Sequence, residues 1–397
     1  MKCYLKKSLY FKRIFIPFII ISLFFPLFPS SYSNDILNVN LSKNIYSKNY
    51  LIFDRNSKNI IIENNGFKKV SIASTTKIMT CILAIENGDL NDTVTISRNA
   101  SKINGSKLGL HAGSTIKLED LLYGLMLRSG NDAAIAIAEH ISGSLDNFII
   151  LMNNKAKELN LINTHFTSPH GLDNKEHYSS CYDLAILTDY ALKNETFNKI
   201  VSTNFTNIYF NKQINSIYNT NNLLKEDNNF YGVKTGFTFN AGRCLVSAYK
   251  KGNIDIILIT LNSNTNKERS KDTLLLKEYI LNNYESKNLK QEIKQAFNLF
   301  LKNNKEEYIK SIPKSEISLS NEFNKLDYFL IKKDSILTYK INITPILSYK
   351  NINNETIGTF NIYENNNLIK TIDIKLISSP KKLDFNFYFF NLLKNMI

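Results

Sequence analysis

The feature that most constrains the fold of this 397-residue chain is a change of hydrophobic spacing near residue 230. Before it, apolar residues recur at helical intervals, as in Ile78, Cys81, Ile82 and Ile85. After it, "RCLVSAYKKGNIDIILITLN" (243–262) contains two apolar runs around a Gly252-Asn253 turn, which predicts two antiparallel strands. Another hairpin is expected at 50–63, where apolar runs flank the polar "DRNSKN" turn. Helices enclosed by hairpins predict a mixed α/β (α+β) unit.

The rest of the pattern divides the chain into segments. Further helices are expected at 117–144 with an interruption at Ser129-Gly130-Asn131, at 148–160, at 180–192 and at 271–303. Residues 315–377 alternate polar residues with Ile, Leu, Phe and Tyr, which predicts a small all-β domain. We therefore expect an N-terminal signal at 1–33, the α/β unit at 34–275, a helical linker at 276–310, a β-rich domain at 311–377 and a tail at 378–397.

The first 33 residues are typical of an export signal. Basic residues (Lys2, Lys6, Lys7, Lys12 and Arg13) precede an apolar run, and "SSYS" then supplies small residues before Asn34. We expect cleavage after Ser33 and an exported, periplasmic protein. The alternative is an uncleaved membrane anchor, although the apolar run is short for a membrane span.

The tail "KKLDFNFYFFNLLKNMI" (381–397) stands apart from the β domain. On a helical wheel its Asp and Asn residues fall on one side and its Phe, Leu and Met residues largely on another. This predicts an amphipathic helix that lies in a membrane interface, peripheral to the inner membrane. The alternative is a final element that packs on the β domain.

Charge and cysteine content exclude several classes of protein. The formal net charge is +14, but the lysines are scattered among Asn and Ile, and no nucleic-acid-binding motif is present. We expect no nucleic-acid partner; proximity to anionic lipid or wall polymer fits the charge better. The cysteines, Cys3, Cys81, Cys181 and Cys244, show no metal-ligand spacing, so we expect free thiols and neither a metal nor a cofactor.

The stretch "SIASTTKIMT" (71–80) places Ser74 three residues before Lys77, so that both lie on one helical face. A Ser-x-x-Lys tetrapeptide alone means little, because this chain contains six of them. Only Ser74 begins a strongly apolar helix, whose N-terminus can stabilise negative charge. A buried Lys77 near other cations would lose proton affinity and could act as a base. Without partner groups, Ser74 would be an ordinary N-cap.

Two distant triplets supply such partner groups. Ser129-Gly130-Asn131 interrupts two helices, so its side chains can point into a cleft. Lys234-Thr235-Gly236 ends an expected strand, where the glycine permits a close approach to the backbone. Lys234 and Thr235 offer a positive charge and a hydroxyl, which suit a carboxylate. The order Ser-x-x-Lys, Ser-x-Asn, Lys-Thr-Gly is that of class A β-lactamases and penicillin-binding proteins.

With these motifs, the sequence resembles the serine D-Ala-D-Ala carboxypeptidases, the low-molecular-weight penicillin-binding proteins of peptidase family S11. The resemblance extends over about residues 45–275 and includes "GSKLGLHAGSTIKLEDLLYGLMLRSGNDAAIAIAEHISGS", "NTHFTSPHGLDNKEHYSSCYDLA", "YGVKTGFTFNAGRCLVSA" and "NKERSKDTLLL". It implies the penicillin-binding/β-lactamase-like transpeptidase fold. It also implies removal of the terminal D-Ala from peptidoglycan stem pentapeptides during cell-wall synthesis, and covalent inhibition by β-lactams.

The resemblance assigns the catalytic roles residue by residue. Ser74 would attack the carbonyl between the two D-alanines and form an acyl-enzyme, with Lys77 accepting its proton. Ser129 would relay a proton to the leaving amine. Asn131 would hold both the substrate amide and Lys77.

The strand motif is assigned to substrate binding in the same way. Lys234, Thr235 and Gly236 would surround the terminal carboxylate. The oxyanion hole would consist of the backbone N–H groups of Ser74 and Phe237. Some family members carry an arginine in the segment before this strand; here Thr220 stands near that place, which leaves a third carboxylate contact open.

Four other functions compete with this interpretation. A D,D-endopeptidase of the same fold would cut cross-links instead of free pentapeptides. A β-lactamase would need an added carboxylate, often in a Glu-x-x-Leu-Asn loop, and no such string occurs. His165, His170, Asp173 and His177 could suggest a zinc peptidase, but their spacing fits no zinc motif that we know. A non-catalytic wall-binding protein would not need every motif residue intact.

Overall fold

A computed structural model describes residues 44–303, 317–324, 328–343 and 356–376. Its largest sheet has the strand order β2-β1-β9-β8-β7, with every neighbouring pair antiparallel. The strands are β1 (Asn49–Asp54), β2 (Asn59–Asn64), β7 (Phe230–Thr238), β8 (Gly242–Lys251) and β9 (Ile254–Ser263). The hairpins expected at 50–63 and 243–262 are therefore confirmed.

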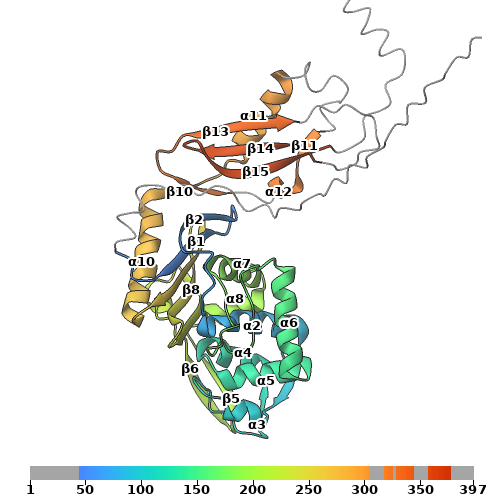
Figure 1. Ribbon diagram of the computed structural model, residues 1–397, viewed down its shortest axis with the longest axis vertical. Helices are drawn as coiled ribbons and strands as arrows, with labels where there is room; N and C mark the ends of the chain where they lie inside the picture. The colour runs from blue at the N-terminus through green and yellow to red at the C-terminus, as the bar shows by residue number, and fades with distance from the viewer. Residues whose placement is uncertain (1–43, 304–316, 325–327, 344–355, 377–397) are drawn as a thin grey trace, which may run out of the picture.

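Helices cover both faces of this sheet (Figure 1). One face bears α2 (Lys77–Asn87), α4 (Leu118–Leu127), α5 (Asn131–Ser142), α6 (Leu145–Glu158), α7 (Cys181–Ala191) and α8 (Glu195–Ser202); the other bears α10 (Asn266–Asn283). Strand β1 shows why both faces are filled. Leu51 and Phe53 belong to the core under the helical face, whereas Tyr50 and Ile52 pack with the α10 side. Because successive side chains point to opposite faces, an apolar run such as "YLIF" suits a sheet covered on both sides.

Helix α2 occupies the middle of the helical layer. Its residues from Lys77 to Ala84 are all buried. A single 3₁₀ turn, Ala73–Thr76, precedes it, so the regular helix begins at Lys77 and not at Ser74. No side chain caps either start. The alternative that Ser74 is an N-cap is therefore wrong, and its hydroxyl is available for other contacts.

Smaller elements complete this part of the chain. They are β3 (Thr93–Thr95), α3 (Arg98–Lys102), β4 (Thr115–Lys117), β5 (Phe205–Phe210), β6 (Gln213–Tyr218) and α9 (Leu223–Glu226). Strands β3 and β4 form one two-stranded sheet, and β5 and β6 form another. The interruption expected at Ser129-Gly130-Asn131 is confirmed, because α4 ends at Leu127 and α5 begins at Asn131.

The continuous helical linker expected at 276–310 is not what the described residues show. Strand β10 (Tyr284–Lys287) separates α10 from α11 (Lys290–Asn303) and pairs with β12 (Phe329–Lys332). The physical reason for this difference is the apolar face of α11. Leu289, Ile293, Phe297 and Leu301 recur every four residues and form one apolar stripe, which needs a partner surface. That stripe packs into the core of the β-rich region, so α11 belongs to that region.

The C-terminal region forms a four-stranded antiparallel sheet in the order β11-β15-β14-β13, as expected for an all-β domain. Its elements are β11 (Ile317–Leu319), α12 (Asn321–Asn324), β13 (Leu337–Ile343), β14 (Thr356–Glu364) and β15 (Asn367–Leu376). It contacts the turn between β1 and β2. Asn59 donates to the Ile369 carbonyl at 2.8 Å, and Lys370 donates to the Ser57 carbonyl at 3.1 Å.

The expected signal and the amphipathic tail lie outside the described residues. Within the described part of the chain, no single helix is long and apolar enough to cross a membrane. Helices α5 and α6 pass such a test only as a pair bent by 87°. Most of α5 is buried in the core, which fits a core helix of a folded domain.

A core substitution in α2 should destabilise the α/β unit. Ile82 is 1 % exposed, so Ile82→Ala removes buried methylene groups and leaves a cavity, which should cost about 3 kcal/mol of unfolding free energy. Ile162, which is 62 % exposed, provides the matched control, and Ile162→Ala should change stability by less than about 0.5 kcal/mol. Urea unfolding followed by fluorescence measures both. Equal effects of the two substitutions would contradict the central position of α2.

Candidate active site

The Lys77 side-chain nitrogen lies among three oxygen atoms. Its Nζ atom donates to Ser74 Oγ at 2.9 Å, to Asn131 Oδ1 at 2.8 Å and to the His170 carbonyl at 2.9 Å. The side chain is fully buried. Burial lowers the pKa of Lys77 well below its ordinary value, and the positive charge of Lys234 lowers it further, while Asp132 opposes the shift. A lysine that loses its proton readily can act as a general base for a serine hydroxyl to which it is hydrogen-bonded.

Two glycines let the surrounding backbone close around Ser74. A Cβ at Gly236 would lie 3.0 Å from the Ser74 backbone nitrogen, and one at Gly171 would lie 2.0 Å from the Ala73 carbonyl oxygen. Gly171 also has a φ of +83°, which disfavours other residues. Strand β7 and the 165–178 loop can therefore approach the 3₁₀ turn only with glycine at these positions.

The Ser129-Gly130-Asn131 loop lies on the opposite side of Ser74. Ser129 has a φ of +63°, which turns the chain between α4 and α5. Asn131 is held from two sides, because its Nδ2 donates to the Asn104 carbonyl and its backbone N–H donates to the Ser106 carbonyl, each at 2.7 Å. The amide oxygen of Asn131 is thereby directed at Lys77.

Asp132 is a buried support that the sequence alone did not reveal. Its carboxylate accepts backbone N–H groups from Leu108, Gly109 and Leu110 at 2.8–3.1 Å. These bonds fasten the preceding loop against the start of α5, which also carries Asn131. An aspartate directly after the Ser-x-Asn motif was the available signal, but nothing in its spacing indicates the distant backbone that it binds.

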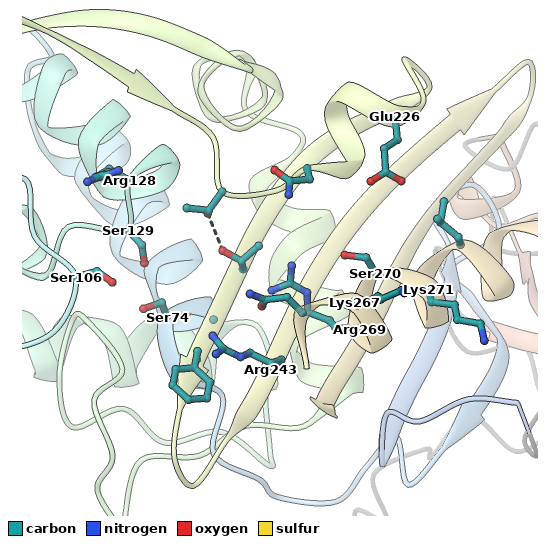
Figure 2. A pocket seen from close by; sticks show the side chains of 17 residues that line it. Ser74, Ser106, Arg128, Ser129, Glu226, Arg243, Lys267, Arg269, Ser270 and Lys271 are labelled. Carbon is teal, nitrogen blue, oxygen red and sulfur yellow. Dashed lines mark hydrogen bonds between the residues drawn. The ribbon is translucent and has the colours of Figure 1, made fainter. Parts of the chain in front are cut away.

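The Lys234 and Thr235 side chains come from β7, the outermost strand of the sheet. Lys234 is 1 % exposed and donates to the Thr235 carbonyl at 3.0 Å. Burial, together with the charge of Arg269, lowers the pKa of Lys234 to about 7. Thr235 Oγ1 lies 2.7 Å from Thr220 Oγ1 (Figure 2). Thr220 thus contacts the strand motif through its hydroxyl.

A cavity of about 690 Å³ joins these groups (Figure 2). Its lining includes Ser74, Ser129, Thr235, Gly236 and Phe237. Lys77 and Asn131 reach it through the hydrogen bonds given above, and Lys234 lies on the same strand. Five of the residues proposed from the sequence therefore line one cavity, and the other three lie one hydrogen bond or one strand position from a lining residue.

Three arginines in the lining, Arg128, Arg243 and Arg269, were not assigned a role from the sequence. Arg269, which is 6 % exposed, comes from the start of α10, and Arg243 comes from β8. Burial lowers the pKa of Arg269 to about 10, and the nearby Arg243 contributes. Among the described residues the Nε atoms of Arg243 and Arg269 have no hydrogen-bond partner. Because buried guanidinium groups without acceptors are costly, this cavity favours an anionic ligand. The signal for Arg269 was its place within the family-like "NKERSKDTLLL".

The histidines of the 165–178 loop have structural partners. His177 Nε2 lies 2.8 Å from Thr76 Oγ1, and His177 Nδ1 accepts the Thr167 N–H. Burial lowers the pKa of His170 to about 3 and that of His177 to about 4, so both rings are neutral at pH 7. In the described ranges no group of three His, Cys, Asp or Glu side chains is arranged to hold a metal ion.

Comparisons with known proteins agree with this geometry. Residues 37–265 match the family model of the peptidase S11 D-alanyl-D-alanine carboxypeptidases. The D-alanyl-D-alanine carboxypeptidase DacF of Bacillus subtilis is 33 % identical over 300 residues, which cover 73 % of this chain and 77 % of the relative.

Solved structures show the same likeness. Penicillin-binding protein 5 from Haemophilus influenzae aligns with a TM-score of 0.68 and 26 % identity over 84 % of this chain and 97 % of its own. The Streptomyces K15 DD-transpeptidase aligns with a TM-score of 0.57 and 32 % identity over 59 % of this chain and 97 % of its own. The longer of the two alignments extends beyond the α/β unit.

The lowered pKa of Lys234 predicts a pH dependence. Lysine is charged below its pKa, so with a pKa of about 7 the charge of Lys234 is lost as the pH rises past neutrality. Arg269→Gln removes a repelling cation, which should raise the pKa of Lys234 and move the alkaline limb of kcat/KM to higher pH. The same substitution should lower kcat/KM itself if Arg269 binds the carboxylate.

The measurement is kcat/KM between pH 5 and 10 with a peptide that ends in a free carboxylate. Lys294→Gln, at an exposed position in α11 outside the cavity, is the control and should leave the alkaline limb in place. An unchanged alkaline limb in Arg269→Gln would contradict the proposed electrostatic coupling.

Proposed function

We propose a specific reaction for this chain, which belongs to the peptidase S11 family of D-alanyl-D-alanine carboxypeptidases and is a hydrolase. It removes the terminal D-Ala from peptidoglycan stem pentapeptides through an acyl-enzyme on Ser74. The observation that carries the assignment is the 2.9 Å hydrogen bond between Lys77 Nζ and Ser74 Oγ beside a cavity lined with cations. This arrangement joins a nucleophile, its base and an anion site.

In the acylation step, neutral Lys77 takes the Ser74 proton while Oγ attacks the carbonyl carbon between the two D-alanines. The C–N bond then breaks, and the leaving amine receives a proton through Ser129. Asn131 keeps Lys77 in place through the 2.8 Å contact with its Oδ1 atom. Water subsequently hydrolyses the ester and releases the shortened peptide.

Substrate binding places negative charge where the cavity is positive. The terminal carboxylate binds to Lys234 and Thr235, with Arg269 close to Lys234. The bound carboxylate in turn favours the charged form of Lys234. The backbone N–H groups of Ser74 and Phe237 polarise the scissile carbonyl as an oxyanion hole. The close approach that Gly236 permits keeps β7 and the 3₁₀ turn, which carry these two N–H groups, close together.

β-Lactams enter the same scheme as covalent inhibitors. Their ring carbonyl takes the place of the scissile amide, and their carboxylate takes the place of the substrate carboxylate. Acylation of Ser74 then opens the ring and leaves a stable ester. The same residues therefore serve substrate and inhibitor.

The proposal predicts the behaviour of two serine variants. The wild-type protein should release D-Ala from a pentapeptide ending in D-Ala-D-Ala and should be labelled covalently by fluorescent penicillin. Ser74→Ala should do neither, because it lacks the nucleophile; an activity loss of at least about 1,000-fold is expected. Ser114, which begins another Ser-x-x-Lys tetrapeptide outside the cavity, is the matched control.

Ser114→Ala should retain labelling and D-Ala release. A wild-type protein that penicillin does not label would refute the serine mechanism. Cleavage of cross-linked dimers without release of D-Ala from pentapeptides would replace the carboxypeptidase by an endopeptidase of the same fold.

We further propose that the protein is exported to the periplasm and associates with the inner membrane. The basic and apolar pattern of residues 1–33 and the amphipathic tail 381–397 support this proposal. Deletion of 381–397 should release the mature protein from membranes into the soluble fraction, as immunoblotting of fractionated cells would show. A truncated protein that stays bound to membranes would rule out the tail as the anchor.

A further inference from the structure

A strained residue directly precedes the nucleophile. Ala73, which opens the 3₁₀ turn before α2, has a φ of +48°. This left-handed conformation is unfavourable for a residue with a Cβ atom and persists only where surrounding contacts enforce it. Ala73 is fully buried, and its backbone dihedrals set the path of the chain into Ser74. The contacts that hold Ala73 therefore also position the nucleophile.

A hydrogen-bond network links this turn to the 165–178 loop. Thr76 Oγ1 donates to the Ala73 carbonyl oxygen at 2.8 Å and also lies 2.8 Å from His177 Nε2. His177 Nδ1 accepts the Thr167 N–H at 3.0 Å. Because Nδ1 accepts, the neutral ring carries its proton on Nε2 and donates it to the Thr76 hydroxyl. Every bond in the network thus has one direction, and the last of them ends at the Ala73 carbonyl.

The ring of His177 is suited to this network at neutral pH. The residue is buried, and the Phe166 ring packs edge-on against it with 5.7 Å between ring centroids. Burial lowers the pKa of His177 to about 4, with smaller contributions from the positive charges of His165 and Lys77, while Asp173 opposes the shift. A neutral ring keeps one acceptor and one donor nitrogen, as the network requires.

The network does not reach the substrate. Neither His177 nor Thr76 lines the cavity, whereas Ser74 and the carboxylate-binding Thr235 do. Loss of the network would therefore displace the nucleophile without removing any group that touches the ligand. The chemical step should suffer from this loss, and the initial binding step should not.

We propose that His177 is a positioning residue, which holds the turn that bears Ser74 through its hydrogen bond to Thr76. This inference rests on the proposed acyl-enzyme function and adds a support to it. Without His177, the Thr76 hydroxyl is free to rotate away from the Ala73 carbonyl, and the strained turn relaxes. The relaxed turn moves Ser74 Oγ relative to Lys77 and to the carbonyl that it attacks.

Acylation of the full-length protein by fluorescent penicillin tests the proposal, because its kinetics separate the initial dissociation constant from the acylation rate constant. His177→Ala should lower the rate constant by about 10- to 100-fold, since a displacement of about 1 Å at a reacting group can cost about 100-fold. The dissociation constant should change by less than about 2-fold, because no binding group is lost. His177→Gln, whose amide nitrogen can donate to Thr76, should recover most of the rate.

Substitutions of Thr76 test the same network from its other side. Thr76→Val removes the hydroxyl at nearly constant volume and should lower the acylation rate constant by a similar factor. Its combination with His177→Ala should cause little further loss, because both act on one network. Thr76→Ser, which keeps the hydroxyl, should retain most of the rate. If His177→Ala does not fold, the comparison of Thr76→Val with Thr76→Ser decides the question.

Two controls separate positioning from stability. Phe148 is buried in α6 outside the network, so Phe148→Leu lowers the melting temperature and should leave the acylation rate constant at its wild-type value. His111→Ala, at an exposed histidine outside the cavity, should change neither quantity. A lower melting temperature in His177→Ala with an unchanged rate constant would overturn the inference and leave the proposed function intact. A wild-type protein that penicillin does not acylate would refute the proposed function itself.

Discussion

The rest of the site depends on the burial of one lysine. The Lys77 amine is fully buried, and within the described part of the chain its Nζ atom donates to Ser74, Asn131 and the His170 carbonyl. These three partners come from three separate segments of the chain. The loss of any one segment's position would leave a buried polar group partly unsatisfied, which costs about 1–3 kcal/mol. The geometry of catalysis and the stability of the surrounding loops are therefore coupled through this amine.

The buried carboxylates that position the site are also fully hydrogen-bonded to backbone N–H groups. Asp132 binds three backbone N–H groups and fixes the loop beside Asn131. Asp272, buried in the second turn of α10, accepts the backbone N–H groups of Tyr46 and Ser47 and so ties that helix to the segment just before β1. α10 carries Arg269 into the cavity. Each of these carboxylates positions charged or polar groups without itself reaching the reacting atoms.

Local patterns of residues predicted much of this molecule. The helical spacing after Lys77, the Gly252-Asn253 turn and the break at Ser129-Gly130-Asn131 each depend on near neighbours, and each occurs as expected. The pairing of β10 with β12 and the packing of α11 depend on distant partners, and no local pattern of residues indicates either of them. The same holds for Asp132 and Arg243. Their roles come from contacts with residues far along the chain, which periodicity and motif spacing do not encode.

The C-terminal region and the active site lie towards opposite ends of the main sheet. The C-terminal region touches the turn between β1 and β2, and the strand register places this turn level with Ile254–Ile256 of β9. Lys234 and Thr238 lie towards the other end of the same strands, near Ile259 and Ser263. The sheet thus lies between the C-terminal region and the active site (Figure 1). The separation between the C-terminal region and the opening beside Ser74 is therefore set by the paired backbone of one sheet.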